Sequence, residues 1–534
     1  MVYALMKNAS SSVDVIAQSM YKTLAQTFPV ACASDEFYYF PHIRLPDQKW
    51  SIWDQFSNER IMDIVKFLSS CENELDVISA SQQNQVTRTD LALLQKFACT
   101  LREQLSEYQI WRKQPTFYLT LASIGLSEAM GSKDPSAIHE RAVGLPGFLD
   151  QAVNNLKHVP LLFRDIAFEM ISDTKQYFEF VRRTVPGINL GIHALNRFEN
   201  ALKKVSTKEN FLLSHDMLEH LVRFHISAEM DTNEVNQKLD REISEMKQIL
   251  EREVRNLNPD LNLSPGSEKT WQEIYENLPI PNLRNKEITS LYRNEVNRLK
   301  EHCLKQGFVL TNLVTSCPVC VTSMPSFLSA IRTASSYSIS PDRPSAGGTF
   351  YIYMLSKKAQ QENLRELGML SAHETYPGHH LLDISRLNLL RSCRTPVEQP
   401  IFYEGWACFA EELMRLTGYF EEPGDRLILA KRRLWRALRG KVDLGLQTGT
   451  MNVTTAAKYL ESAGFSRERA RSSARKYPLN TGYQLCYTIG IRRFLDLFNK
   501  YGRENLQHFV QMVLKQGEIL FTDLEDIRSE TPVK

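Results

Sequence analysis

The chain has 534 residues, a length that fits about three to four domain-sized units or one large helical body. With 43% hydrophobic and 24% charged residues, its composition is that of a globular protein, which excludes disorder as the main state. The net charge of +2 gives no support for a nucleic acid or an anionic membrane as partner, and nine scattered cysteines favour a reducing compartment.

The N-terminal segment predicts a helix rather than a secretory leader. One lysine stands among the first 21 residues, and no continuous apolar core follows it. Val13, Ile16, Met20 and Leu24 instead recur at the spacing of one helical face. Nowhere in the chain do 18 apolar residues follow one another, so we expect no membrane partner and predict a soluble, cytoplasmic protein.

Helical periodicity continues through most of the sequence. Apolar residues within 61–68 and 91–101 recur about every 3.6 positions, which predicts amphipathic core helices. Residues 231–254 alternate apolar positions with charges, as is typical of a long, partly exposed helix. The fold class predicted is mostly α, without internal repeats.

Two proline-containing stretches interrupt this pattern, at 257–283 and 316–348. They divide the chain into an N-terminal helical region, 1–315, and a second region, 316–534, which we expect to form one integrated structure. Residues 349–355 follow a Gly-Gly turn and are β-branched and aromatic, so they predict the clearest strand.

A histidine cluster in the second region points to metal chemistry. Three of the twelve histidines, His373, His379 and His380, lie within eight residues, beside Glu374. An H-E-x-x-H helix places two histidines one turn apart, so that both bind one zinc ion while the glutamate acts as general base. Here that position is Pro377, which has no ligating atom and no N–H, so we predict a helix break that moves the second ligand.

Either histidine after Gly378 can supply this second ligand. His380 lies near the right face of an ideal helix, but about 10 Å further along it at a rise of about 1.5 Å per residue. His379 is closer along the axis, but it faces the metal only if the helix distorts. We favour His379, and the sequence leaves both open.

The third ligand is expected from a helix over 401–416. Glu404 follows His379 by 25 residues, an interval that fits a loop and a returning helix, and Glu411 lies seven residues later on the same face. A buried carboxylate is costly unless something such as a metal compensates it. The alternative is an exposed helix start, where Glu404 would favour the helix dipole.

These motifs resemble a known family. HETYPGHH (373–380) and FYEGWACFAEEL (402–413) closely resemble the HExxPGHH and EGWAxYAE pair of the DUF885 family, whose members are regarded as zinc-dependent peptidases. GGTFYIY resembles the family's edge strand, RALRGKVDLGLQTG (436–449) its R-x-x-R…D-x-G-L-H segment, and KYPLNTGYQLCYTIG (476–490) its P-x-Q-A-x-x-Y-x-x-G segment. The resemblance is strong over about 325–515 and weak before 300.

The resemblance implies a large multi-helix, gluzincin-like body with a central groove and a small β element near the active site. The metal ligands it implies, for one zinc ion (Zn²⁺) per chain, are His373, His379 and Glu404, with His380 as a rival or neighbour. Glu374 would be the general base, and Tyr487 would stabilise an oxyanion.

Three positions depart from the family pattern. Gln447 stands where a histidine is expected, Gly482-Tyr483-Gln484-Leu485 replaces Pro-Gly-Gln-Ala, and Tyr353 replaces an asparagine. We expect these positions to face the substrate rather than the metal, so the departures concern substrate choice.

A basic run from Lys431 to Lys441 occupies the helix of the third motif. It is either a solvated helix face, or Arg436 and Arg439 point inward and bind a substrate carboxylate, which suits the guanidinium fork. The second alternative favours a carboxypeptidase over an endopeptidase. Tyr483 is a further candidate for substrate binding or for donation to the oxyanion.

The sequence as a whole predicts a metallohydrolase that cleaves amide bonds in short peptides or peptide-like molecules, with metal-activated water and Glu374 as base. A groove around a deep metal site favours small substrates. The alternatives are a specialised biosynthetic or catabolic amide hydrolase and a non-catalytic scaffold. The oligomeric state stays open.

Two other patterns carry less weight. Cys317 and Cys320 form a C-x-x-C pair, but no second pair stands at zinc-ribbon spacing. His215, His220 and His225 recur every five residues, a step that walks round a regular helix, so we expect that they do not share a metal.

Overall fold

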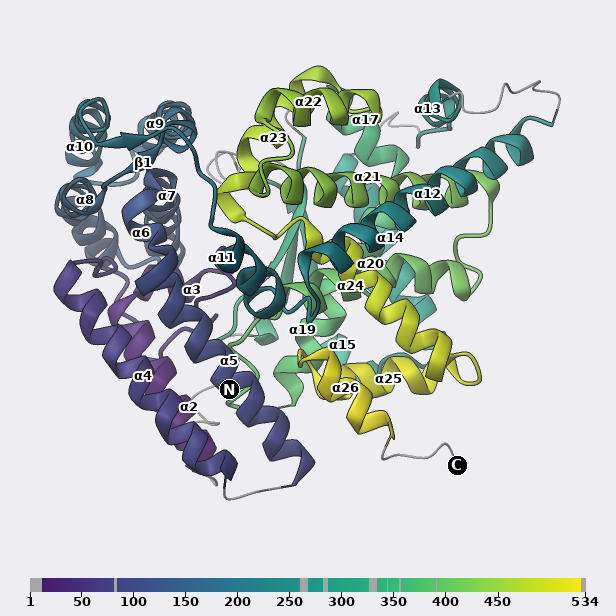
Figure 1. Cartoon of the computed structure of the whole chain (residues 1–534), viewed down its shortest axis with the longest axis horizontal. Helices are drawn as coiled ribbons and strands as arrows, with labels where there is room; N and C mark the ends of the chain where they lie inside the picture. The colour runs from purple at the N-terminus through teal and green to yellow at the C-terminus, as the bar shows by residue number, and fades with distance from the viewer. Residues whose placement is uncertain are drawn as a thin grey trace.

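The computed structural model describes residues 12–80, 84–259, 268–281, 287–325, 334–342, 344–354, 357–389 and 391–529. Helices make up most of these residues, and the strands form two small sheets. The structure confirms the predicted mostly α-helical body (Figure 1). In this part of the chain no helix is both long and apolar enough to span a membrane.

The N-terminal region packs through the apolar faces that the sequence predicts. Val13, Ile16, Met20 and Leu24 are all buried. The elements up to residue 225 are α2 (Ser12–Thr27), α3 (Pro29–Ala33), α4 (Asn58–Ala80), α5 (Gln85–Glu103), η1 (Gln104–Tyr108), α6 (Ile110–Lys113), α7 (Pro115–Ser132), α8 (Pro135–Asn155), β1 (Val159–Pro160), α9 (Leu161–Val181), α10 (Ile188–Leu202), β2 (Thr207–Lys208), α11 (His215–His220) and η2 (Leu221–His225). Strands β1 and β2 pair in parallel.

Helix α12 (Thr232–Leu257) confirms the long helix predicted over 231–254. It starts with a capping box, in which the Asp231 carboxylate accepts the N–H of Glu234 and the Glu234 carboxylate accepts the N–H of Asp231. Its apolar face is buried along α21 (Figure 1). The stretch 257–283 contains a further helix, α13 (Glu268–Asn277), which the proline content did not predict.

The second region continues the helical packing, and α20 and α21 both pack against α24 at its centre. Its helices, with α14 before the boundary, are α14 (Ile288–Lys305), α15 (Thr311–Ser316), α17 (Lys357–Arg365), α18 (Leu367–Glu374), α19 (His379–Asn388), α20 (Pro400–Leu416), α21 (Pro423–Gln447), α22 (Val453–Ser462), α23 (Arg467–Lys476), η4 (Tyr477–Asn480), α24 (Leu485–Leu497), η5 (Phe498–Gly502), α25 (Leu506–Gln516) and α26 (Phe521–Ser529). The division at residue 315 stays a prediction. Across it α12 packs on α21, and α14 packs on strand β3.

A three-stranded sheet lies beside the histidine motif. Strands β3 (Val319–Ser323) and β4 (Ser336–Ile339) flank β5 (Gly348–Ile352), which pairs in parallel with β3 and antiparallel with β4. A 3₁₀ turn, η3 (Pro344–Ala346), precedes β5. The predicted strand is confirmed through Ile352, and Leu355 lies outside the described residues.

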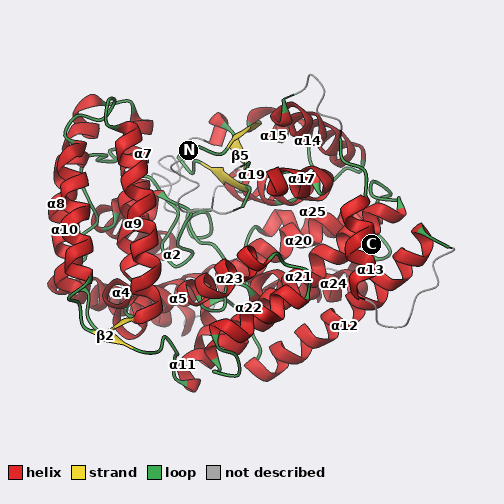
Figure 2. Ribbon diagram, turned by 90° about the horizontal axis from the view of Figure 1, so that it is seen from above, coloured by secondary structure: helices red, strands yellow, loops and turns green. Residues whose placement is uncertain are grey.

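The two regions face each other across a cleft, as expected for a central groove. Figure 2 shows helices α7 to α10 as a block opposite the helices of the second region. A cavity of about 230 Å³ opens between them, lined by Tyr38, Tyr108 and Phe163 from one side and by Leu479 and Thr481 from the other. The ring of Tyr38, on the wall of this cavity, lies 6.4 Å from that of Tyr483.

Candidate metal centre

The helix breaks between the two halves of the histidine motif, as Pro377 predicts. Helix α18 ends at Glu374 and α19 begins at His379. The N–H of Gly378 turns back to the carbonyl of Ala372 at 3.0 Å, and a Cβ on Gly378 would lie only 1.8 Å from the carbonyl oxygen of His373. Only glycine fits there, and the turn brings the rings of His373 and His379 to 4.9 Å.

Three buried side chains converge on one point. The Nε2 atoms of His373 and His379 each lie 3.6 Å from Oε2 of Glu404. This is too long for a hydrogen bond, but it is close to the edge of a tetrahedron with metal–ligand bonds of about 2.0–2.1 Å, which is about 3.4 Å. Within the described part of the chain, Oε2 of Glu404 is buried without a hydrogen-bond partner. The donor set and its spacing therefore fit a divalent metal.

Helix α20 holds Glu404 in place through a close helix contact. A Cβ on Gly405 would lie 2.5 Å from Cα of Gly490 in α24, so the two backbones touch here. The contact brings Tyr483 to Glu404, whose Oε1 accepts the tyrosine hydroxyl at 3.0 Å. Tyr487 lies beside Tyr483, with 6.1 Å between the rings, and its hydroxyl also hydrogen-bonds Glu404. Oε2 of Glu404 thus faces the two histidines, while Tyr483 holds Oε1.

A second layer orients His373. Its Nδ1 lies 3.0 Å from Oε1 of Glu411, which also binds Arg432 at 2.9 Å and Arg436 at 2.6 Å. Burial raises the pKa of Glu411, but these two arginines and His373 together lower it well below its usual range. Nη2 of Arg436 also lies 3.2 Å from Nδ1 of His373. In the tautomer that leaves Nε2 of His373 free for a metal, Nδ1 carries the proton and the ionised Glu411 accepts it. The position of Glu411 on the Glu404 face was visible in the sequence, but this contact was not.

His379 is held differently. Its ring stacks on Tyr403 at 4.1 Å, and among the described residues its buried Nδ1 has no hydrogen-bond partner. The two histidines therefore differ in their support, one by a carboxylate and one by an aromatic ring.

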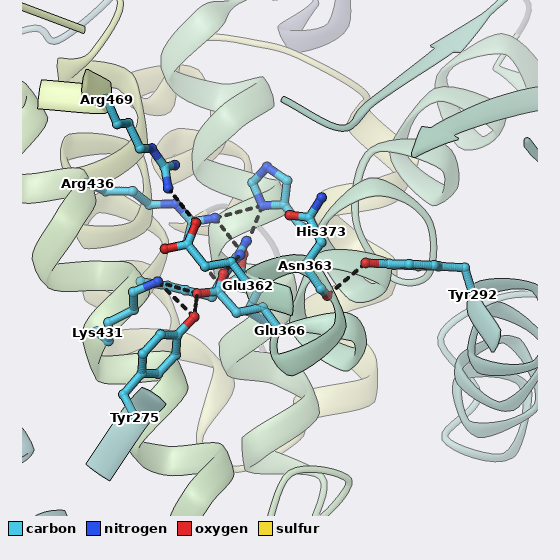
Figure 3. Close-up of polar contacts among 11 residues, drawn as sticks. Tyr275, Tyr292, Glu362, Asn363, Glu366, His373, Lys431, Arg436 and Arg469 are labelled. Carbon is cyan, nitrogen blue, oxygen red and sulfur yellow. Dashed lines mark hydrogen bonds and ion pairs between the residues drawn. The ribbon is translucent and has the colours of Figure 1, made fainter. Parts of the chain in front are cut away.

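The basic run of α21 binds buried carboxylates, so the alternative of a solvated helix face is wrong. Arg432 joins Glu411 to Glu366, and Lys431 also binds Glu366. Figure 3 shows this network beside His373, with the hydroxyl of Tyr275 donating to Glu366 at 2.7 Å. Glu366 precedes α18, so the network fixes the helix that carries His373 and Glu374.

Glu374 lies in this enclosed site with 6% of its surface exposed. Burial raises the pKa of its carboxyl, and the nearby His373 and His379 oppose that rise. A carboxylate whose pKa moves toward neutrality is suited to accept and return a proton.

The structure does not bring His380 to the cluster. Its Nδ1 lies 2.9 Å from the hydroxyl of Tyr337 on β4, and its Nε2 lies 3.0 Å from the carbonyl oxygen of Cys317. Both ring nitrogens are used, because the helix break turns His379 toward Glu404 and His380 toward the sheet. Of the two histidines that the sequence left open, only His379 lies with His373 and Glu404.

The two arginines expected to bind substrate, Arg436 and Arg439, differ in how strongly the protein itself engages them. Both terminal nitrogens of Arg436 bind Glu411, so a substrate carboxylate would have to compete with that ion pair. Arg439 is half-buried, donates to Oε1 of Gln484 at 2.8 Å and lies over the ring of Tyr487 at 4.8 Å. Arg439 is the better placed of the two for a substrate. Gln447 donates to Thr481, a residue of the cleft, at 2.9 Å.

The two discounted patterns have different outcomes. Cys317 and Cys320 are free, the first buried and the second exposed. His220 and His225 do lie on one side, since both contact Glu103, at 2.6 and 2.8 Å, while His215 is not part of this group. The reason is that η2 is a π-helical turn, in which residues five apart lie on one side. The expectation that the three histidines do not share one metal stays a prediction.

Comparisons with known proteins give a family and a fold. Residues 44–526 match the family described as "Bacterial protein of unknown function (DUF885)". A putative lipoprotein of unknown function from Shewanella oneidensis is 16% identical, with a TM-score of 0.77 over 98% of this chain and 100% of that chain. The putative lipoprotein from Colwellia psychrerythraea is 15% identical, with a TM-score of 0.80 over 96% and 97%. No curated protein sequence matches the chain.

Proposed function

Because this chain belongs to the DUF885 family, whose description gives no function, we propose its function from the site itself: a zinc-dependent hydrolase of amide bonds in short peptides or peptide-like small molecules. One observation carries the proposal. Two histidine nitrogens and a carboxylate oxygen lie at metal-ligand spacing, buried, next to Glu374. Two histidines, one carboxylate and an open position are the donor set of catalytic zinc sites.

The chemistry divides between the metal and the protein. When bound, zinc acts as a Lewis acid and lowers the pKa of a water ligand to about 7. Glu374 accepts the proton of the attacking water and returns it to the leaving amine. Tyr487 donates its hydroxyl to the carbonyl oxygen as negative charge develops there, while the hydroxyl of Tyr483 remains on Glu404. Glu411 keeps the proton of His373 on Nδ1 throughout.

The substrate class follows from the cleft. The cavity beside Tyr38 and Thr481 is about 230 Å³, a volume for a small molecule or a few residues of an extended peptide rather than a folded protein. Arg439 supplies a positive charge close to Tyr487 that can bind the terminal carboxylate of a peptide. We therefore propose carboxypeptidase-like cleavage, and a free acid should be cleaved faster than the same peptide with an amidated terminus.

The test combines metal content with turnover. Protein purified without an affinity tag is analysed by plasma mass spectrometry, and a dipeptide and tripeptide library is screened with the wild type and the variants Glu374→Gln and Glu404→Ala. We expect Glu374→Gln to retain zinc and lose turnover, and Glu404→Ala to lose both. Undiminished hydrolysis by Glu374→Gln would refute the role of the base. A wild type that takes up no metal at micromolar zinc would favour a scaffold.

A specialised amide hydrolase is the second candidate. Gln447 replaces the family histidine, and its Oε1 is buried without a partner among the described residues, next to the cleft. A polar group in this position is suited to bind an unusual substrate group. If the protein binds zinc but hydrolyses no peptide of the library, this candidate is favoured over a peptidase.

We also propose a cytoplasmic location, because all nine cysteines are free. The two similar structures are described as putative lipoproteins, which favours the opposite. Fractionation of cells that make the protein tests the location: recovery in the cytosolic fraction is expected, and recovery with membranes would overturn it.

A further inference from the structure

A second group of two histidines and a glutamate lies outside the site described above, where α5 ends and η2 begins. The Nε2 atoms of His220 and His225 lie 2.6 and 2.8 Å from the same Oε2 of Glu103. The side chain of His225 is 1% exposed and that of Glu103 is 16% exposed, while His220 borders solvent at 38%. The three ligand atoms all lie within 4.8 Å of one another.

The amide of Gln104 can support either protonation state of His225, because it can donate to Nδ1 or accept from it. As placed, its Nε2 lies 3.0 Å from Nδ1 of His225, while its Oε1 is buried without a hydrogen-bond partner in the described part of the chain. Exchanging the amide oxygen and nitrogen, which occupy equivalent positions, lets Oε1 accept a proton from Nδ1 of His225. The exchange leaves the amide nitrogen in the position without a partner, so the hydrogen bonds of Gln104 alone do not select either orientation.

That exchange has a consequence for the other side of the ring. With the proton on Nδ1, the Nε2 lone pair of His225 faces the Glu103 carboxylate at 2.8 Å, so two acceptors meet. A cation bound by both acceptors stabilises this tautomer and moves them apart to about 3.4 Å, the edge of a tetrahedron with bonds of about 2.0–2.1 Å. Without a cation, Nε2 of His225 keeps the proton and donates it to Glu103. Gln104 would then support His225 as Glu411 supports His373, by accepting the proton of the non-ligating nitrogen.

The local charge also admits a cation. Arg102 lies 3.4 Å from Oε1 of Glu103, on the side away from the histidines, and its guanidinium is bound by Glu72 at 2.7 Å. The two carboxylates exceed the one guanidinium by one negative charge. Lys96, whose Nζ donates to the carbonyl oxygen of His225 at 3.1 Å, is a further basic group here, and burial lowers its pKa to about 7. Nitrogen and carboxylate donors of this kind suit zinc.

We propose that Glu103, His220 and His225 bind a second zinc ion, separate from the one at His373, His379 and Glu404. The ion is structural, because it joins α5 to η2. The ring of Tyr108, which lines the cleft, lies 4.9 Å from that of His225, so the site supports the cleft wall.

The same turn reaches the first site. Two residues after His225, Ser227 donates to Oε1 of Gln399 at 2.9 Å, and Gln399 is the N-cap of α20, which carries Glu404. Zinc at the second site therefore fixes both a wall of the cleft and the start of a ligand-bearing helix.

The experiment counts zinc per chain in full-length protein dialysed against micromolar zinc. We expect two in the wild type, one in His220→Gln, one in His373→Gln and none in the double variant. His215→Gln is the matched control: it removes an exposed histidine from the same helix and should leave two. Glu103→Gln, checked by circular dichroism, replaces His220→Gln if that variant does not fold.

The outcomes separate this inference from the proposed hydrolase. One zinc in the wild type, retained in His220→Gln and lost in His373→Gln, would overturn the second site and leave the first intact. Two zinc ions retained in both His220→Gln and Glu103→Gln would also overturn it. One zinc in the wild type, lost in His220→Gln and retained in His373→Gln, would support the second site and refute the metal of the first.

Discussion

The two His₂Glu clusters of this protein have the same residue types and different surroundings. In the first, the ligand atoms stand 3.6 Å apart, and His373 is supported by an ionised carboxylate inside a network of arginines. In the second, they stand 2.6 and 2.8 Å apart, and His225 is supported by a neutral amide. The first cluster also has Glu374 beside it. The comparison teaches that the same ligand types can stand in surroundings that favour different roles, and we propose turnover for the first cluster and stability for the second.

Substitution of Glu374 tests the difference between the two clusters most directly. Replacing Glu374 by Gln should lower kcat by about 10²–10⁴-fold while leaving the zinc content unchanged, because the side chain moves a proton and binds no metal. Steady-state kinetics on the best peptide of the library measure the effect. Equal kcat in variant and wild type would mean that the first cluster, like the second, is structural.

Tyr487 and Tyr483 test the difference between the clusters on the substrate side of the first one. Tyr487→Phe should lower kcat by about 10²–10³-fold, as loss of an oxyanion donor does elsewhere, with little change in KM. Tyr483→Phe is the matched variant, and it should instead weaken zinc binding, because its hydroxyl orients Glu404. If the two variants behave in the opposite way, their roles are exchanged.

Replacing Glu411, which supports His373, is expected to have a smaller effect that is confined to the first cluster. Glu411→Gln should weaken zinc binding at the first cluster by about 10–100-fold, since His373 loses its proton acceptor, and should leave the second cluster unaffected. Competition with a chelator measures both affinities. Glu412→Gln changes the neighbouring glutamate, which binds Arg415 on the same helix, and should affect neither. Equal weakening by both variants would contradict the assignment of Glu411.

The smallest effect is expected at His380. The change to Gln removes one of two buried hydrogen bonds, to Tyr337 or to Cys317, and should lower the free energy of unfolding by about 1–3 kcal/mol. Zinc content should stay as in the wild type, because neither ring nitrogen faces the cluster. Urea unfolding and metal analysis of the same sample test both statements, and a lost zinc ion would make His380 a ligand.

The sequence predicts the first cluster because its ligands lie in two short motifs. His373, Glu374 and the proline that breaks the helix are adjacent, and Glu404 follows at the interval of one helical return. The long helix α12 was equally clear, since capping and periodicity agree over its whole length. Local patterns of this kind depend on neighbours in the chain.

What the sequence did not show depends on distant partners. Glu103 and His220 are 117 residues apart, and the π-helical turn that aligns His220 with His225 departs from the 3.6-residue period on which the prediction relied. The basic run of α21 resembled a solvated face because its carboxylate partners come from α12, from the residue before α18 and from α20. Charge pairing across helices leaves no periodic signal in one segment.

The contact between Gly405 and Gly490 makes the geometry of the site a property of the main chain. Glu404 is next to one glycine, and Tyr487 precedes the other by three residues, so neither side chain can be adjusted independently of how α20 and α24 meet. A single added methyl group would push the two helices apart and move Glu404, the proposed metal ligand, together with Tyr487, the proposed oxyanion donor. Metal affinity and turnover would then change together, because both depend on the same backbone contact.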